Sequence, residues 1–135
     1  MPLKQYTLAG AERLKSRKQI DLVFKEGARI NIFPLRVSFI LEKGSGDALQ
    51  FGVGVSAKSF KKAVDRNRVK RLARESWRVQ KNDLRQMLAD HKFRMVVFVV
   101  YTGKELPVYD TVYQAMAAVI EKLSRMVHET IEANP

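Results

Sequence analysis

The chain has 135 residues, of which 46% are hydrophobic, enough to bury one ordinary core, so we interpret residues 1–135 as a single domain. Its 25 lysines and arginines outnumber 14 aspartates and glutamates, and the formal net charge of +11 indicates nucleic acid or an anionic membrane surface as partner rather than an acidic metabolite. Because cysteine is absent, disulfides, thiolate nucleophiles and cysteine-ligated metal sites are excluded.

The first predicted element is a helix that begins at Ser16. Ser16 and Gln19 have the spacing of a capping box, and Gly27 is the residue type that most often ends a helix in the left-handed conformation. Between them, apolar residues that include Phe24 recur at helical spacing. The pattern predicts one short amphipathic helix.

Two longer strands are predicted next. Apolar and polar residues alternate over residues 33–41 and again over residues 49–55, and turn-forming residues occupy positions 43–47 between them. We expect these two strands to pair antiparallel. A shorter strand is predicted at residues 28–32.

The second half of the chain is predicted to form helices around one strand. A helix is expected from residue 61 or 62 to about residue 80, with a further helical stretch at residues 84–89. Residues 95–100 form an unbroken, valine-rich run that is typical of a strand buried on both faces in the interior of a sheet. Asp110 is a fair N-cap for a last amphipathic helix that extends to the end of the chain.

The helix predicted at residues 61–80 carries an unusual density of positive charge. Residues 58–78 contain nine basic side chains and only two acids, Asp65 and Glu75, so self-repulsion favours a polyanionic partner. At 100° per residue the apolar side chains fall on one arc and most basic ones on the opposite arc, which predicts one packed face and one binding face. The candidate binding residues are Lys58, Lys61, Lys62, Arg66, Asn67, Arg68, Lys70, Arg71, Arg74 and Arg78.

A second candidate surface is the face of the predicted sheet opposite the core. Small and polar side chains there would leave room for a single strand of nucleic acid, with Phe24 or Phe33 at the margin to stack on a base. Alternatively, the glycines mark a bulge or a close helix contact, and Phe24 belongs to the core. The candidates for this cleft are Phe24, Arg36, Ser38, Gly52, Gly54 and Ser56.

No catalytic constellation is evident in the sequence. His91 and His128 have no nucleophile or acid nearby at the spacing of a triad or a metal site, and the glycines form no phosphate-binding loop. The carboxylates do not have the paired spacing with which a nuclease holds magnesium. We therefore assign no catalytic residue and no metal site. Residues 1–10 lack a continuous apolar segment and residues 95–101 are too few to cross a bilayer, so we expect a cytoplasmic protein without a membrane partner.

Residues 63–75, which read AVDRNRVKRLARE, closely resemble the signature of the bacterial ribonuclease P protein component. The resemblance extends to residues 14–27, similar to the first helix of that family, to residues 51–56, similar to the strand before the signature, and to residues 95–98, similar to its late apolar strand. Residues 108–135 match in helical character only.

The resemblance implies an α+β fold, a two-layer α/β sandwich of the ribosomal-protein-like type with the order αβββαβα and a left-handed crossover. It also implies that the RNA subunit is the catalyst, with magnesium held mainly by RNA. The protein would then dock on the ribonuclease P RNA through the Arg-Asn-Arg helix, one protein per catalytic RNA, and hold the 5′ leader of precursor tRNA in a cleft beside the sheet. The reaction that the resemblance implies is hydrolysis of the phosphodiester bond that frees the mature tRNA 5′ end.

Three departures from the family pattern bear on the site. Residues 58–62 lack the glycine that usually shapes the loop before the signature, Asp65 replaces an apolar or basic residue, and Ile20 replaces an aromatic one, which leaves Phe24 as the stacking candidate. Arg68 lies at the edge of the basic arc, so it contacts either RNA or its own fold.

Three other functions compete with this interpretation. A structural or ribosomal RNA-binding protein would have the same charge and fold. A DNA-binding regulator needs a reading helix in a helix-turn-helix frame, and a self-contained nuclease needs metal ligands. Restoration of precursor-tRNA cleavage by a bacterial ribonuclease P RNA at low magnesium separates the first two of these from a ribonuclease P protein.

Overall fold

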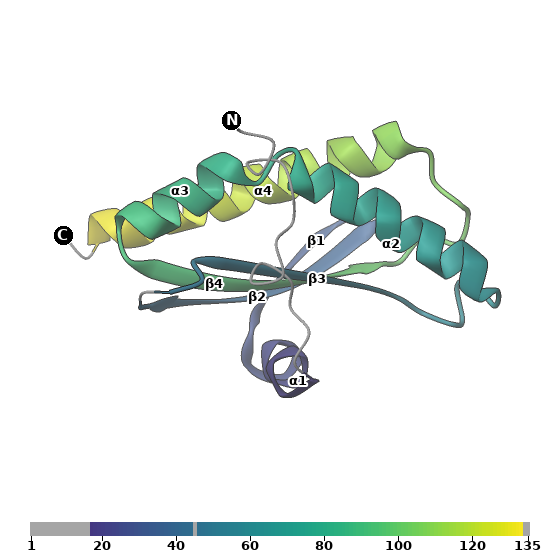
Figure 1. Ribbon diagram of the computed structural model, residues 1–135, viewed down its shortest axis with the longest axis horizontal. Coiled ribbons are helices and arrows are strands. Elements are labelled where there is room, and N and C mark those ends of the chain that lie inside the picture. Colours follow the sequence, from purple (N-terminus) through teal and green to yellow (C-terminus); the bar gives the residue numbers. More distant parts are fainter. Residues whose placement is uncertain (1–16, 45, 134–135) are drawn as a thin grey trace.

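The computed structural model describes residues 17–44 and 46–133, which form a four-stranded sheet with helices on both faces (Figure 1). Three helices, α2, α3 and α4, cover one face, and α1 lies against the other. This arrangement confirms the predicted α+β sandwich. The elements in chain order are α1 (Arg17–Glu26), β1 (Ala28–Ile32), β2 (Leu35–Lys43), β3 (Leu49–Val55), α2 (Ala63–Arg78), α3 (Asn82–Asp90), β4 (Phe93–Tyr101) and α4 (Tyr109–Ala133).

The strand order is β1-β2-β4-β3, so the last strand in sequence lies inside the sheet. β2 and β4 pair antiparallel with Leu35 opposite Tyr101, whereas β3 and β4 pair parallel with Leu49 opposite Met95. The predicted antiparallel pairing of residues 33–41 with 49–55 is therefore wrong. Alternation shows that each segment is a strand but not which strand is its neighbour, and the apolar β4 takes the position with neighbours on both sides. Its predicted interior place is confirmed.

The larger core lies between the sheet and helices α2 to α4. Trp77 of α2 is fully buried and stacks on Phe51 of β3, with ring centroids 4.4 Å apart and planes 13° apart. Val69, Ala73 and Ser76 are buried on the same side of α2, as the 100° periodicity predicts. This packing fixes the opposite, basic side of α2 toward solvent.

A smaller apolar cluster joins α1 to the other face of the sheet. Val23 is buried against Phe98 of β4, and Phe24 packs beside them. The backbone N–H of Gly27 donates to the carbonyl of Val23 (2.9 Å), and a Cβ on Gly27 would lie only 2.4 Å from that oxygen. Gly27 follows α1 at the predicted position, because a Cβ there would clash with backbone atoms of the helix and of β2, but the predicted left-handed conformation is wrong: Gly46, not Gly27, is the described glycine with a positive φ. The predicted start at Ser16 lies outside the described residues.

The remaining helix boundaries agree with the sequence to within a few residues. Asp110 stands in the first turn of α4 rather than at its N-cap, since α4 begins at Tyr109. The parallel pair β3 and β4 is joined through α2 and α3, and the left-handed sense of that crossover stays a prediction. Within the described ranges, no helix combines the length and the apolar character needed to cross a membrane.

Candidate nucleic-acid interface

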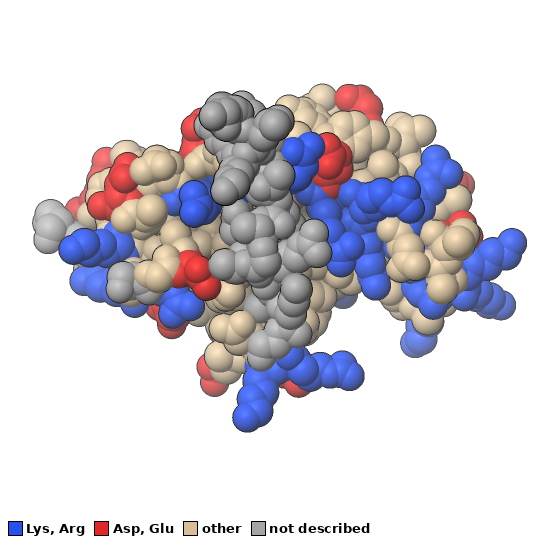
Figure 2. Space-filling model, in the orientation of Figure 1, with Lys and Arg blue, Asp and Glu red and all other residues tan. Residues whose placement is uncertain are grey.

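The solvent face of α2 is the most basic surface in the described part of the chain. Figure 2 shows lysine and arginine side chains gathered over this helix. Asn67, Arg68 and Arg71 are exposed, and Lys70 is half-buried. Neither Arg68 nor Arg71 has a hydrogen bond or ion pair with any other described residue, so both guanidinium groups are available to a ligand. For Arg68, this favours the ligand-binding alternative over an attachment to its own fold.

The loop before α2 is held by an arginine of the same basic run. Arg66 Nη1 donates hydrogen bonds to the carbonyl oxygens of Phe60 (2.7 Å) and Lys61 (2.9 Å). Residues 58–62, which we call the docking loop, contribute the exposed amines of Lys58, Lys61 and Lys62. Because its guanidinium is used in this way, Arg66 differs from the other basic residues of α2: it shapes the surface as well as adding charge to it.

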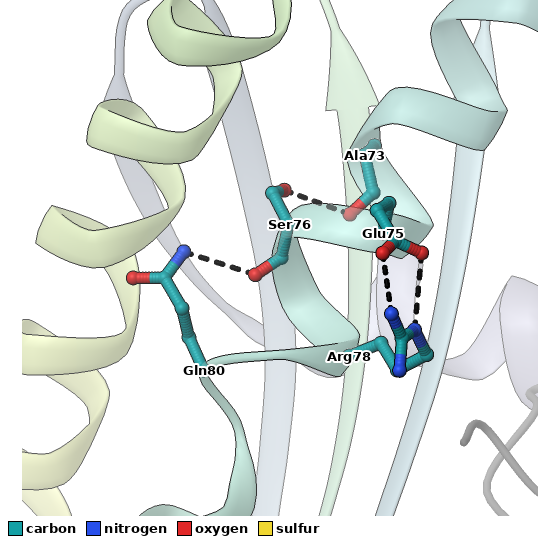
Figure 3. Close-up of polar contacts among 5 residues, drawn as sticks. All are labelled: Ala73, Glu75, Ser76, Arg78 and Gln80. Atoms are coloured by element: carbon teal, nitrogen blue, oxygen red, sulfur yellow. Dashed lines mark hydrogen bonds and ion pairs between the residues drawn. The ribbon is translucent and has the colours of Figure 1, made fainter. Parts of the chain in front are cut away.

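Arg78, at the C-terminal end of α2, is also held by the protein itself. It forms a two-pronged ion pair with Glu75, in which Nε donates to Oε2 at 3.0 Å and Nη2 pairs with Oε1 (Figure 3). The hydrogen bond from Arg78 lowers the pKa of Glu75, and the same bond raises the pKa of Arg78. The pair offsets the positive charge of Arg78, so this residue contributes less field to the basic face than the sequence suggests.

The end of α2 is tied to α4 through Gln80. Its Nε2 donates to the carbonyl of Ser76 (2.9 Å) and to that of Tyr113 (3.2 Å), while the Ser76 hydroxyl donates to the carbonyl of Ala73 (2.9 Å; Figure 3). The bond to Ser76 satisfies one of the last four carbonyls of α2, which have no partner within the helix, and the bond to Tyr113 links α2 to α4. They keep the basic face in a fixed orientation relative to the sheet.

A groove of about 490 Å³ lies between α1 and α2 above strand β3. Its walls carry charged side chains together with apolar surface. On the α2 side stand Lys70 and Arg74, so this groove is continuous with the basic face. The residues that line it are Arg17, Ile20, Asp21, Phe24, Phe51, Gly52, Val53, Gly54, Val55, Lys70, Arg74 and Phe98.

The floor of this groove is shaped by glycine and phenylalanine. β3 pairs with β4 without interruption, so neither Gly52 nor Gly54 marks a bulge. A Cβ on Gly54 would lie 3.2 Å from the ring of Phe98, which shows how closely that ring covers the strand. Phe24, half-buried, packs edge-on against Phe98 with centroids 5.0 Å apart. Phe24 therefore belongs to the small apolar cluster and lines the groove as well.

The predicted cleft residues do not all meet in this groove. Phe24, Gly52 and Gly54 line it, but Arg36 and Ser56, although exposed, do not. Ser38 is only 2% exposed and lies on the face covered by α1. The separation follows from the strand order, because β4 stands between β2 and β3 and moves the β2 side chains away from the groove.

Sequence reasoning missed Phe98, the ring at the centre of the groove floor. The run of residues 93–101 is apolar throughout, so no periodicity distinguishes a ring facing the groove from one facing the core. Arg17 and Asp21, which form the α1 rim, were also missed. Their spacing of four residues on an amphipathic helix is the one signal that places them on the same side.

The described residues contain no group of three or more histidine, aspartate or glutamate side chains that could hold a metal ion. His91 Nδ1 lies 3.1 Å from the carbonyl of Met87, and His128 Nε2 lies 3.0 Å from Glu132 on the same helix. Both histidines are exposed, and neither lines the groove. The exposed lysines and arginines can bind an extended anion, and within residues 17–44 and 46–133 no nucleophile stands beside a base that would activate it.

The sequence is similar to a known protein family over most of its length. A family model described as Ribonuclease P matches residues 8–124. The ribonuclease P protein component of Porphyromonas gingivalis W83 is 38% identical over 114 residues, which cover 82% of each chain. That of Borreliella burgdorferi B31 is 28% identical over 117 residues, 87% of this chain and 93% of the relative.

The fold is likewise similar to solved structures. The RNase P protein from Thermotoga maritima aligns with a TM-score of 0.63 and 26% identity, over 82% of this chain and 96% of that one. An RNase P protein from Staphylococcus aureus gives the same TM-score of 0.63 at 20% identity, over 82% and 94% of the two chains, and this match shows a likeness of fold.

Proposed function

This chain belongs to the bacterial ribonuclease P protein family, and from its place as the protein subunit of a tRNA-processing ribonuclease P we propose that α2 and the docking loop bind the ribonuclease P RNA while the groove beside α1 holds the 5′ leader of precursor tRNA. The observation that carries the proposal is the continuity of the two surfaces. Lys70 and Arg74 of the basic helix form one wall of a groove, and the floor of this groove consists of apolar side chains and glycines. An RNA docked on α2 therefore brings its substrate next to the groove.

The docking role rests on the chemistry of the α2 side chains. Arginine presents a planar fork that can bridge two phosphate oxygens or stack on a base, which a lysine amine cannot do. Arg68 and Arg71 are exposed with no partner among the described residues, and Asn67 between them adds a donor and an acceptor that can contact base edges or a 2′-hydroxyl. The surface is therefore prepared for RNA without first breaking internal ion pairs.

The leader role rests on the composition of the groove. A single RNA strand has a charged backbone and flat apolar bases, and proteins bind it with cationic walls and aromatic platforms. Arg17, Lys70 and Arg74 supply the cations, and Phe24 supplies a ring edge beside the glycine floor. The absence of a side chain at Gly54 leaves room for the Phe98 ring, which with Phe24 gives the floor its aromatic surface.

We further propose that the RNA subunit performs the hydrolysis and that one copy of this protein binds each catalytic RNA. The described residues provide no cluster of acids or histidines for a magnesium ion, so the catalytic ions of the holoenzyme would be held by the RNA and the substrate. The contribution of this chain is then to bind, to orient the leader and to offset the negative charge where two RNA molecules meet.

Reconstitution with a bacterial ribonuclease P RNA tests the proposal. At low magnesium, the protein should stimulate 5′ cleavage of precursor tRNA, and protein rigorously freed of RNA should not cleave. Arg71→Ala should weaken binding to the catalytic RNA and lower the log–log salt slope by about 0.7 to 0.9, the loss expected for one phosphate contact.

Arg125→Ala is the matched control, because Arg125 is an exposed arginine of α4 paired only with Glu121 one helical turn away. It should leave affinity, slope and cleavage unchanged. Cleavage by the protein alone would overturn the assignment of chemistry to RNA. Binding without any stimulation of cleavage would favour a purely structural RNA-binding protein.

A further inference from the structure

A second cavity, of about 610 Å³, opens at the end of the sheet nearest the docking loop. We call it the end pocket and define it by six of the residues that line it: Phe33, Pro34, Tyr101, Lys104, Leu106 and Val108. None of these lines the groove beside α1. The function proposed above makes no use of the end pocket.

The walls of the end pocket are fixed by hydrogen bonds. The N–H and the hydroxyl of Thr102 both donate to the carbonyl of Pro34, at 2.8 and 3.1 Å, and the Tyr101 hydroxyl donates to the carbonyl of Glu105 at 2.9 Å. Gly103 is required in this loop, because a Cβ there would lie 2.5 Å from the Tyr101 hydroxyl oxygen. The cavity is therefore formed before any ligand arrives.

Exposed apolar side chains are concentrated at the end pocket. Among the described residues six large apolar side chains are exposed, and three of them line it: Phe33 at 82%, Val108 at 67% and Leu106 at 43%. Scattered exposed apolar residues are ordinary, but a contiguous group around a cavity marks a binding site. The ring of Phe33 is almost wholly in solvent, which is the position of an aromatic platform rather than of a core residue.

The charge around the end pocket decides what binds there. The lining itself carries one charge of each sign, Lys104 and Glu105. Tyr101, in its wall, packs against Phe60 of the docking loop with ring centroids 6.0 Å apart, so a loop with three exposed lysines passes beside the pocket and makes its surroundings positive. A second copy of a chain with a net charge of +11 would be repelled from this end. A nucleotide meets both requirements, since its base is flat and apolar and its phosphate is anionic.

We propose that the end pocket receives one unpaired, extruded base of the ribonuclease P RNA, stacked on Phe33, with Lys104 contacting an adjacent phosphate. The proposal rests on the docking role of α2 and adds a second, apolar point of attachment to it. The RNA subunit rather than precursor tRNA is the source, because the pocket adjoins the docking loop and shares no lining residue with the groove beside α1.

Equilibrium binding of Phe33→Ala to ribonuclease P RNA over a series of salt concentrations tests the proposal. Loss of one base on an aromatic ring should weaken binding about 5- to 150-fold. The log–log salt slope should stay unchanged, because stacking releases no counterions. Phe33→Trp should retain affinity, and Leu22→Ala, which removes an exposed apolar side chain of α1, is the control that should match the unmodified protein.

Photocrosslinking identifies the partner directly. With p-benzoylphenylalanine in place of Phe33, a crosslink to one unpaired nucleotide of the ribonuclease P RNA supports the proposal. A crosslink only to the precursor leader, or to a second copy of the protein, overturns it, as does unchanged affinity of Phe33→Ala. If Phe33→Ala is silent while Arg71→Ala still weakens binding with a reduced slope, the end pocket is refuted and docking through α2 stands; if both are silent, docking through α2 fails as well.

Discussion

The two faces of α2 belong to one helix of sixteen residues, but the inner face is stabilised by burial and the outer face carries solvent-exposed charge. On the inner face, Trp77 and its neighbours are excluded from water and contribute to stability through burial. On the outer face, Arg68 and Arg71 are exposed and form no hydrogen bond or ion pair with another described residue, so they should contribute little to stability. The comparison teaches that on one helix the loss of stability and the loss of RNA binding should be separable by mutation, except where a residue belongs to both faces.

The largest effect is expected on the inner face. Trp77→Ala removes a fully buried ring that stacks on Phe51, and should lower the free energy of unfolding by about 3 to 5 kcal/mol. Chemical denaturation measures the loss, and Trp77→Phe should recover part of it. Near-normal stability of Trp77→Ala would mean that the inner face of α2 is not the anchor described above.

Phe24 tests whether the same separation holds at the groove, since it both packs against Phe98 and lines the cavity. Phe24→Ala should reduce holoenzyme affinity for precursor tRNA by about 1 to 3 kcal/mol, the range for one stacked base, with mature tRNA unaffected. Because Phe24 is only half-buried, the loss of stability should stay below the 3 to 5 kcal/mol typical of a buried ring.

Phe24→Leu is the informative control for that experiment, because it retains apolar packing and removes the ring. Its stability should be close to that of the unmodified protein while precursor affinity still falls. Equal losses for precursor and mature tRNA would instead assign Phe24 to packing alone.

Arg66 is the residue of the outer face whose mutation should lower both stability and RNA binding. Its guanidinium holds two carbonyl groups of the docking loop, so Arg66→Ala should cost about 1 to 3 kcal/mol of stability and also weaken RNA binding. Arg71→Ala should weaken binding with no change in stability. Parallel thermal melts and salt-dependent binding of the two variants make the distinction, and identical behaviour would remove the structural role of Arg66.

The smallest effect is expected at the Glu75–Arg78 pair, which lies at the surface and is partly exposed to solvent. Glu75→Gln should lower stability by no more than about 0.5 kcal/mol and, by removing an acid from the basic face, should slightly strengthen RNA binding. Weaker RNA binding by this variant would show that Glu75 orients Arg78 toward RNA.

The pH dependence of that pair has a definite sign. The pKa of Glu75 lies below its ordinary value of 4.5 in the folded chain, so the stabilising contribution is present above pH 4.5 and is lost as the pH falls through the lower, folded value. Denaturation curves of the unmodified protein and Glu75→Gln should therefore converge under acid conditions. A stability difference between them that grows as the pH falls would contradict the assignment.

The sequence predicted local structure well and spatial neighbours poorly. The two faces of α2 followed from periodicity alone, because a helix brings together residues three and four apart. The partner of strand β3 did not, since pairing is decided by segments about fifty residues away. For the same reason Arg36 and Ser38 were placed in a cleft that β4 separates from them.

Within the basic run, sequence could not distinguish bound from available arginines. Arg66 and Arg78 differ from Arg68 and Arg71 because Arg66 bonds two loop carbonyls and Arg78 bonds the Glu75 carboxylate, and these contacts depend on side-chain conformation rather than on residue type. The end pocket escaped detection because its walls come from a turn after β1 and a loop after β4 that are far apart in the chain. The signature run identified the family without revealing these individual roles.

The interior place of β4 has a consequence for synthesis of the protein. A nascent chain that ends before Phe93 contains β2 and β3 but not the strand to which both are bonded. It also lacks Phe98, so neither the packing site of α1 nor the groove floor is complete, although all of α2 has already been synthesised. The ordered RNA-binding surface is therefore acquired in one late step, when the last strand enters between its two neighbours.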